Sequence, residues 1–168
     1  MSAVQCLAHT TREVWKCTQQ ESEDKAIAQA IKILTQRLNK HSHMPVLNST
    51  TLVANFLTLQ FAQLDREQFG CLFLHKHHHL ICYETLYVGT IGHCSVYPRE
   101  VVKRALFHNA TGIVMVHNHP SGSGKASEED IKLTHTLRDT LKLVDVVLQD
   151  HIIVHGQDTY SMRHNALF

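Results

Sequence analysis

Residues 116–130, VHNHPSGSGKASEED, decide the predicted fold because they join a strand to a helix through a glycine-containing turn. Side chains two residues apart in a strand point the same way, so His117 and His119 are expected on one face. Ser127 is typical of a helix N-cap. Asp130 then falls in the first helical turn, and we expect it to point back towards the two imidazoles.

This stretch predicts a metal site made by His117, His119 and Asp130. Three nitrogen and oxygen ligands are typical of catalytic zinc, which keeps its fourth position for water, whereas structural zinc is normally closed by four ligands, often cysteines. Residues 116–130 contain no cysteine. Zinc lowers the pKa of a bound water to about 7, so the pattern predicts hydrolysis. The alternative is a pair of strand-end histidines bonded to backbone groups.

Two more residues are candidates for chemistry. A general base is needed, and Glu67, just ahead of the first predicted strand, is the first choice, with Glu84 as the second. Ser127 is a candidate to stabilise a developing oxyanion with its hydroxyl. A serine followed by acidic residues is also a good helix N-cap, and the two roles are compatible.

The front of the chain is predicted to be helical. Its first 69 residues contain no glycine, and apolar residues recur there at helical intervals: Ile27, Ile31, Leu34 and Leu38. A second helix is expected after residues 48–50, with its apolar side formed from Leu52, Phe56, Leu59 or Leu64. We therefore assign residues 1–47 to an N-terminal helical extension and residues 48–168 to the main domain.

The main domain alternates between strand-like and helical patterns. Strand-like segments are expected at residues 70–74, 80–88, 113–117, 144–148 and 151–154, and helices are expected to begin at Pro98 and Ser127. The histidine-rich run 75–79 is predicted to be a hairpin turn. Strands with helices between them indicate an α/β fold, a mixed β-sheet flanked by helices.

Composition narrows the function classes. The chain has 168 residues, 43% of them hydrophobic, which is the size of one ordinary domain. Its five cysteines are odd in number and form no CxxC pair, so a disulfide framework is not expected. The net charge of +1 does not favour nucleic acid, and no apolar stretch is long enough for a membrane span or signal peptide. A cytoplasmic protein with no membrane partner is therefore expected.

These residues together resemble a known family. Glutamate, HxH, seven residues, serine, two residues and aspartate form the JAMM pattern of the JAB/MPN group, and Glu67, His117, His119, Ser127 and Asp130 match it. The resemblance to RadC-type members extends to residues 83–86, 89–90, 96–102, 117–122 and 150–154. The chain is similar to short RadC-like proteins without the helix-hairpin-helix segment.

The resemblance implies a JAB/MPN (cytidine deaminase-like) architecture and a zinc metallohydrolase related to the JAMM isopeptidases and deubiquitinases. It implies His117, His119 and Asp130 as Zn²⁺ ligands, Glu67 as the base and Ser127 as an assisting group. Two segments depart from the usual family pattern, residues 123–126 and 75–79. Because these segments contain none of the implied zinc ligands, the departures bear on the implied substrate recognition more than on the implied metal binding.

Three functions follow as hypotheses. The first is a metallopeptidase that cleaves a peptide or isopeptide bond in a protein or peptide substrate. The second is a DNA repair or DNA-processing factor of the RadC type, which the low net charge does not favour. The third is a non-catalytic interaction module stabilised by zinc. Asp150 and His151 are either a structural hydrogen-bonded pair or a support for the metal site.

Overall fold

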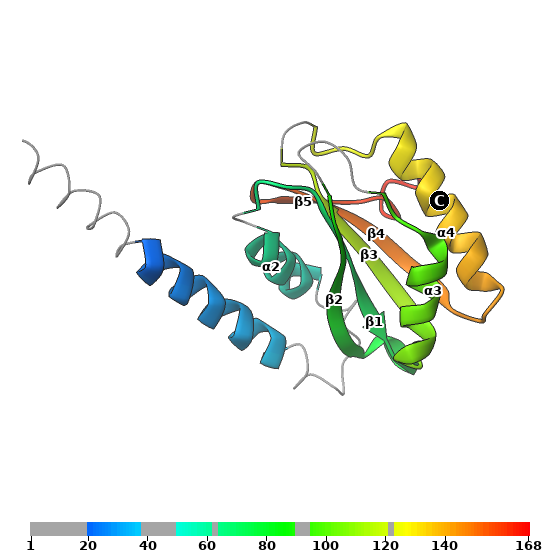
Figure 1. The fold of residues 1–168 in the computed structure, drawn as a ribbon, viewed down its shortest axis with the longest axis horizontal. Coiled ribbons are helices and arrows are strands. Elements are labelled where there is room, and N and C mark those ends of the chain that lie inside the picture. Colours follow the sequence, from blue (N-terminus) through cyan, green and yellow to red (C-terminus); the bar gives the residue numbers. More distant parts are fainter. Residues whose placement is uncertain (1–19, 38–49, 62–63, 90–94, 121–122) are drawn as a thin grey trace, which may run out of the picture.

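The computed structural model describes residues 20–37, 50–61, 64–89, 95–120 and 123–168. Five strands form one sheet in the order β2-β1-β3-β4-β5 (Figure 1). The strands are β1 (Gln68–Leu74), β2 (Leu80–Val88), β3 (Gly112–Asn118), β4 (Val147–His155) and β5 (Asp158–Ser161). β3 and β4 pair in parallel, and the other neighbours pair antiparallel. The sheet is therefore mixed, which confirms the prediction.

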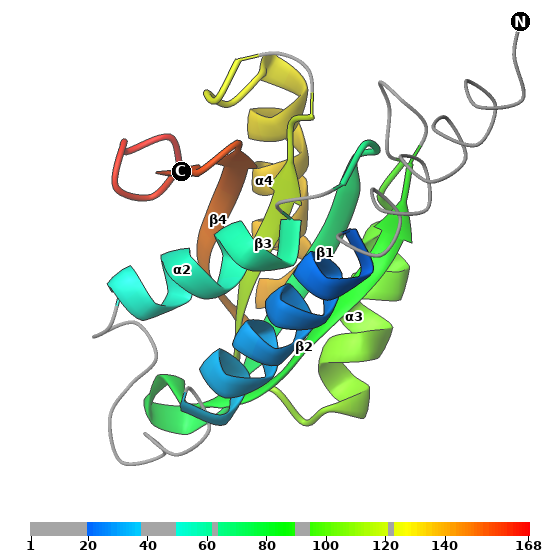
Figure 2. The same cartoon turned by 90° about the vertical axis from the view of Figure 1, so that its left-hand side faces the viewer.

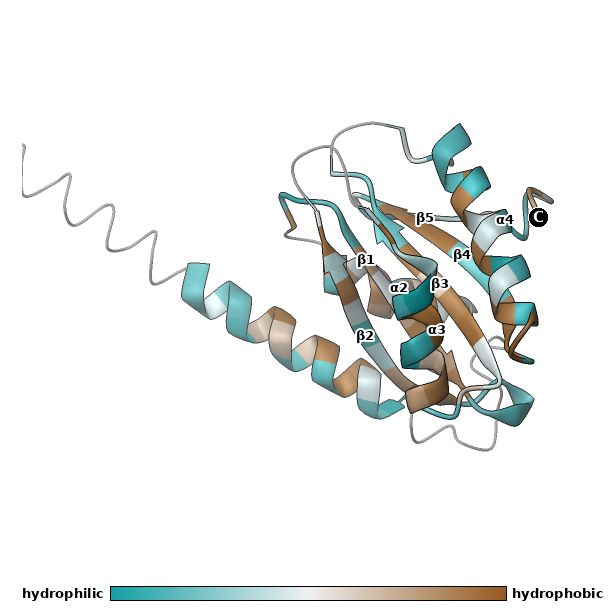
Figure 3. Cartoon of the chain, turned by 45° about the vertical axis from the view of Figure 1, so that its right-hand side comes forward, coloured by the Kyte–Doolittle hydropathy of each residue, from teal (hydrophilic) through white to brown (hydrophobic). Residues whose placement is uncertain are grey.

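Helices cover both faces of the sheet. On one face lie α2 (Thr50–Phe61) and a helix at residues 20–37, and on the other lie α3 (Pro98–Phe107) and α4 (Glu128–Lys142) (Figure 2). Along α4, hydrophilic and hydrophobic residues alternate in bands, whereas β3 is hydrophobic along most of its length (Figure 3). The α/β class predicted from the sequence, with helices on a mixed sheet, is confirmed.

The two cores follow from side-chain alternation in the central strands. In β1, Cys71 and Phe73 face α3 and α4, whereas Leu72 and Leu74 face α2. All seven residues of β3 are buried, because this strand lies between β1 and β4 and is covered on both faces. The polar residues at its end are therefore held by a rigid, buried strand.

The β3–α4–β4 connection places the helix start beside the strand end. Parallel strands need a crossover, and α4 supplies it. Ser127 is the N-cap of α4, and its side chain accepts a hydrogen bond from the backbone N–H of Asp130. The predicted helix start is confirmed, and the first turn of α4 lies at the carboxyl end of β3.

The histidine-rich segment between β1 and β2 is a hairpin turn, as predicted. Lys76–His78 form a short 3₁₀ turn, and the His75 N–H donates to the His79 carbonyl at 2.7 Å. His77 and His78 adopt positive φ values of 66° and 62°.

Several sequence expectations need correction. The segments 144–148 and 151–154 belong to one strand, β4, and β5 was not expected. Leu38 lies outside the described residues. The boundary between residues 1–47 and 48–168 stays a prediction.

Within the part of the chain that the structure describes, no helix combines the length and hydropathy needed to cross a bilayer.

Candidate metal centre

The structure brings His117, His119 and Asp130 together at the carboxyl end of β3. His117 is the sixth residue of β3, and His119 comes directly after the last residue of that strand. Asp130 is the third residue of α4. His117 Nε2 lies 2.9 Å from His119 Nε2 and 3.1 Å from Asp130 Oδ1, and His119 Nε2 lies 3.5 Å from Asp130 Oδ2. The convergence expected from the residue spacing is therefore present.

These distances fit a single zinc ion. Zinc bonds to histidine nitrogen and carboxylate oxygen are about 2.0–2.2 Å, so donor atoms around a tetrahedral zinc lie roughly 3.2–3.6 Å apart. The distances that join the three groups are 2.9, 3.1 and 3.5 Å, within a few tenths of an ångström of this range, and the two distances to Asp130 end on different carboxylate oxygens. The donor set therefore fits Zn²⁺, although its role as the ligand set stays a prediction.

Asp130 is held in place by the start of its own helix. Its Oδ2 accepts hydrogen bonds from the Ser127 N–H at 2.8 Å and the Ser127 hydroxyl at 2.7 Å. Burial raises the pKa of the Asp130 carboxyl, but hydrogen bonds with His117, His119 and Ser127 outweigh this effect and hold the pKa well below its ordinary value. At neutral pH this group is an anion, the form in which it binds a cation.

His119 presents its Nε2 atom to the cluster because its other nitrogen is fixed. Nδ1 lies 2.7 Å from the Ser123 carbonyl oxygen, which only accepts, so Nδ1 carries a proton. In the neutral ring Nε2 is then free to bind a metal. The hydrogen bond to Asp130 raises the pKa of His119, while the burial of His119 lowers it.

His117 is oriented by a buried chain of hydrogen bonds that returns to α4. The Thr134 hydroxyl donates to the Asp130 carbonyl at 2.6 Å. His151 Nδ1 lies 2.7 Å from that hydroxyl oxygen and therefore donates to it, which leaves His151 Nε2 as an acceptor. His117 Nδ1, 2.8 Å from that Nε2, donates in turn. In the neutral ring of His117, the unprotonated Nε2 therefore faces the cluster.

Burial keeps the His151 ring in this chain neutral. His151 and Thr134 are both fully buried. Burial lowers the pKa of His151 well below its usual value, and the nearby His117 lowers it further. The proton positions are thus set by an acceptor-only carbonyl at one end and a neutral ring in the middle. The sequence left two roles open for His151, a structural hydrogen-bonded pair with Asp150 or a support for the metal site. It gave no signal for Thr134.

Asp150 supports His151 through the backbone and does not touch the cluster directly. Its carboxylate accepts from the His151 N–H at 2.7 Å, the Ser161 hydroxyl at 2.6 Å and the Arg163 N–H at 3.1 Å. Burial raises the pKa of Asp150, and these hydrogen bonds lower it in part. Asp150 therefore fixes β4 to the C-terminal segment, and His151 makes the contact with the metal-site residues.

Glu67 lies beside the cluster because of strand register. Phe69 pairs with His117, so continuing that antiparallel register by two residues brings Glu67 opposite His119. The charge of Glu67 raises the pKa of His119, which is consistent with this proximity.

Asn118 holds the Glu67 backbone in position. Its Oδ1 accepts from the Gln68 N–H at 2.7 Å, and its Nδ2 donates to the Arg66 carbonyl at 3.1 Å. The Glu67 carbonyl accepts from the Gly89 N–H at 2.8 Å. Asn118 lies between the two histidines in the sequence and, by strand alternation, was expected to point to the opposite face.

Glu84, the second candidate base, is engaged elsewhere. Arg104 Nε donates to its Oε2 at 2.7 Å, and His108 Nε2 lies 2.8 Å from its Oε1. Arg104 and His108 lower the pKa of the Glu84 carboxyl, against the opposing effect of burial. Glu84 is therefore an ion-paired anion on β2 and no longer a candidate base for the His117 cluster.

Fold and site together define an α/β domain that carries a His-His-Asp cluster at the end of its central strand. The sequence model of the RadC-like JAB domain matches residues 47–167, which is more than half of the chain. The chain belongs to the RadC-like JAB domain family.

Curated relatives agree with this assignment. The chain is 45% identical over 132 residues to "UPF0758 protein YkfG" of Escherichia coli (strain K12), covering 77% of this chain and 84% of that protein. It is 42% identical over 147 residues to "UPF0758 protein YeeS" of the same organism, covering 86% of this chain and 97% of that protein. These names state no activity.

Proposed function

We propose that this chain is a zinc-dependent hydrolase of the JAMM type that cleaves a peptide or isopeptide bond in a protein or peptide substrate. The observation that carries the proposal is the convergence of His117, His119 and Asp130, whose two imidazole nitrogens and one carboxylate lie within metal-binding distance of one another. Three ligands of this kind leave a coordination position for water.

Each chemical role has a residue suited to it. Zinc bound by His117, His119 and Asp130 would polarise the scissile carbonyl and lower the pKa of a bound water. Glu67 takes the proton from the attacking water and returns it to the leaving amine nitrogen. The Ser127 hydroxyl, which caps α4, turns its proton towards the developing oxyanion.

Hydrolysis of quenched peptide and branched isopeptide substrates by the purified chain tests the proposal. We expect cleavage that a chelator abolishes and Zn²⁺ restores. A zinc-loaded protein that cleaves none of them and binds DNA with a steep salt dependence would instead favour the DNA-processing hypothesis. A zinc-loaded protein that neither cleaves nor exchanges a metal-bound water would favour the interaction module.

Ser127→Ala is expected to lower kcat about 100-fold, the usual effect of removing one oxyanion donor. It should also lower the free energy of unfolding by about 1 kcal/mol, because the N-cap of α4 is lost. Steady-state kinetics and chemical denaturation measure the two effects separately. Ser127→Thr keeps a hydroxyl and should recover most of both. Loss of stability with an unchanged kcat would reduce Ser127 to a helix cap.

His151→Phe is expected to weaken zinc binding about 10- to 100-fold, the usual cost of losing a group that orients a metal ligand. The change removes the acceptor for His117 Nδ1 and leaves that N–H buried and unpaired. Competition with a chromophoric chelator measures the zinc affinity, and thermal melting of the metal-free protein monitors the fold.

Two further variants complete that test. Thr134→Val removes the hydroxyl with little change of shape and should also weaken zinc binding. His164→Phe alters an exposed histidine and should leave zinc affinity unchanged. Unchanged affinity in a well-folded His151→Phe protein would show that the buried chain does not orient the ligand.

A further inference from the structure

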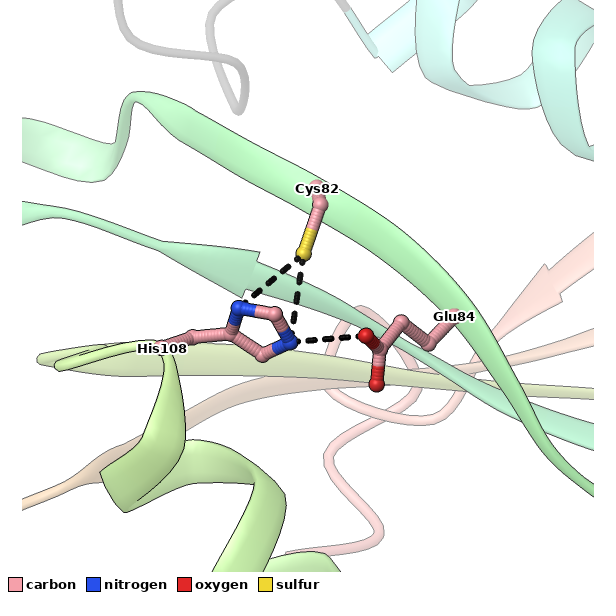
Figure 4. Close-up of side chains that lie close together, drawn as sticks. All are labelled: Cys82, Glu84 and His108. Atoms are coloured by element: carbon pink, nitrogen blue, oxygen red, sulfur yellow. Dashed lines mark hydrogen bonds and ion pairs between the residues drawn. The ribbon is translucent and has the colours of Figure 1, made fainter.

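A second cluster of metal-ligating side chains lies on the α3 side of the edge strand β2. Cys82 and Glu84 are two residues apart on β2 and share a face, and His108 is the C-cap of α3 (Figure 4). Cys82 Sγ lies 3.6 Å from both ring nitrogens of His108, and His108 Nε2 lies 2.8 Å from Glu84 Oε1. The three ligand atoms lie within 4.8 Å of one another.

This cluster lies on other secondary-structure elements than the His117 cluster and has a different set of ligand atoms. Strand β1 separates β2 from β3, which carries His117. Cys82, Glu84 and His108 have no role in the hydrolytic mechanism proposed above. Their donor set of sulfur, nitrogen and oxygen also differs from the two imidazoles and one carboxylate at the end of β3.

A cation is already bound between two of the three donors. Arg104 Nη2 lies 2.5 Å from Glu84 Oε1 and 3.2 Å from His108 Nε2. The Arg104 guanidinium also lies over the Phe107 ring, 4.3 Å from its centroid. One guanidinium nitrogen thus stands where a metal bound to both donors would lie, and the site is built to hold positive charge.

We propose that Cys82, Glu84 and His108 form a second zinc-binding site, and that Arg104 is the cation which neutralises it when zinc is absent. Thiolate, imidazole and carboxylate are all zinc ligands. The sulfur favours zinc over calcium or magnesium, which prefer all-oxygen sites. With three protein ligands, one position remains for water or another donor.

Zinc wins the competition with Arg104. The Arg104 and Glu84 side chains are 32% and 25% exposed, and a partly exposed ion pair contributes little beside bonds to zinc. Zinc needs only one oxygen of Glu84, Oε1. The other oxygen, Oε2, keeps its hydrogen bond from Arg104 Nε. That remaining bond then orients the carboxylate, as hydrogen bonds to metal-bound carboxylates commonly do.

Local changes suffice for binding. Donors around a tetrahedral zinc lie roughly 3.2–3.8 Å apart when one is sulfur, so the Sγ to Nε2 distance of 3.6 Å already fits. The gap of 2.8 Å between Nε2 and Oε1 opens by about half an ångström. Sγ lies 3.6 Å from both ring nitrogens of His108, whereas a zinc ion bound to Nε2 would lie on the Glu84 side of the ring. The Cys82 side chain must therefore shift towards Glu84 to reach the same ion. The Cys82 thiol proton leaves to solvent as the zinc–sulfur bond forms.

Titration of the metal-free chain with Co²⁺ under reducing conditions tests this site. A thiolate bonded to Co²⁺ gives a sulfur-to-metal charge-transfer absorption, which the His117, His119 and Asp130 set cannot give because it contains no sulfur. We expect this band in the native chain and in Asp130→Asn, and we expect Cys82→Ser and His108→Ala to abolish it. The outcome of this Co²⁺ titration therefore does not depend on whether the hydrolase proposal is correct.

Two controls sharpen the result. Arg104→Gln should bind Zn²⁺ at this site about five- to tenfold more tightly, because a competing ion pair is lost. His77→Ala, in the exposed hairpin turn, should change neither the band nor the affinity. A charge-transfer band that is missing from the native chain, or that survives in Cys82→Ser, would overturn the proposal. Equal affinity in Arg104→Gln would overturn the role given to Arg104.

Discussion

Asp130→Asn is expected to remove both zinc and hydrolysis from the site at the end of β3. The substitution keeps the size of the side chain but removes its charge, and only a carboxylate supplies an anionic ligand there. Loss of a group that merely orients a ligand costs about 10- to 100-fold in metal affinity, so loss of a ligand should cost more than about 100-fold. Equilibrium dialysis of the metal-free protein against Zn²⁺ measures the affinity.

A neighbouring acid provides the matched control. Glu129→Gln removes the same charge from the same helical turn but alters an exposed side chain. It should keep full zinc affinity and full activity. If Asp130→Asn binds zinc at this site as tightly as the native protein does, Asp130 is not a ligand and the proposed centre is wrong.

Glu67→Gln should separate catalysis from metal binding. We expect kcat to fall about 10²- to 10⁴-fold, the usual contribution of a positioned general base, because glutamine cannot accept the proton of the attacking water. Zinc content should stay at the native level, since Glu67 lies beside His119 and is not one of the converging donors. Steady-state kinetics and metal analysis on the same preparation give both values.

Asp65→Asn is the control for that experiment. Asp65 is exposed and lies two residues away, so its charge is removed without touching the candidate base. It should hydrolyse at the native rate. Native activity in a zinc-loaded Glu67→Gln protein would rule Glu67 out as the base.

The central βα unit could be predicted from local patterns because its signals agree. A buried apolar run gave β3, and a serine N-cap ahead of acidic residues gave the start of α4. The geometry of a strand and a first helical turn then placed three side chains together. His117, His119 and Asp130 were accessible from the sequence for this reason.

β4 was split in two because polar residues interrupt its pattern. Gln149 and Asp150 lie in the middle of the strand. Asp150 is tolerated there because Ser161 and Arg163, from the C-terminal segment, donate hydrogen bonds to it. Such compensation depends on residues distant in sequence, so periodicity could not indicate it.

The other features that were missed also depend on contacts across the fold. Thr134 meets His151 only because α4 packs on β4. His108, at the end of α3, reaches Cys82 on β2 from 26 residues away. Spacing rules detect ligands within one segment, as in HxH, and give no signal for a cluster assembled from an edge strand and a helix end.

The central claim is most directly tested by anomalous scattering at the zinc edge from crystals of the zinc-loaded chain. The account predicts an anomalous peak bonded to Nε2 of His117, Nε2 of His119 and a carboxylate oxygen of Asp130, with a water as the fourth ligand. Absence of a peak between these three residues, or a fourth protein side chain that closes the coordination sphere, would contradict it.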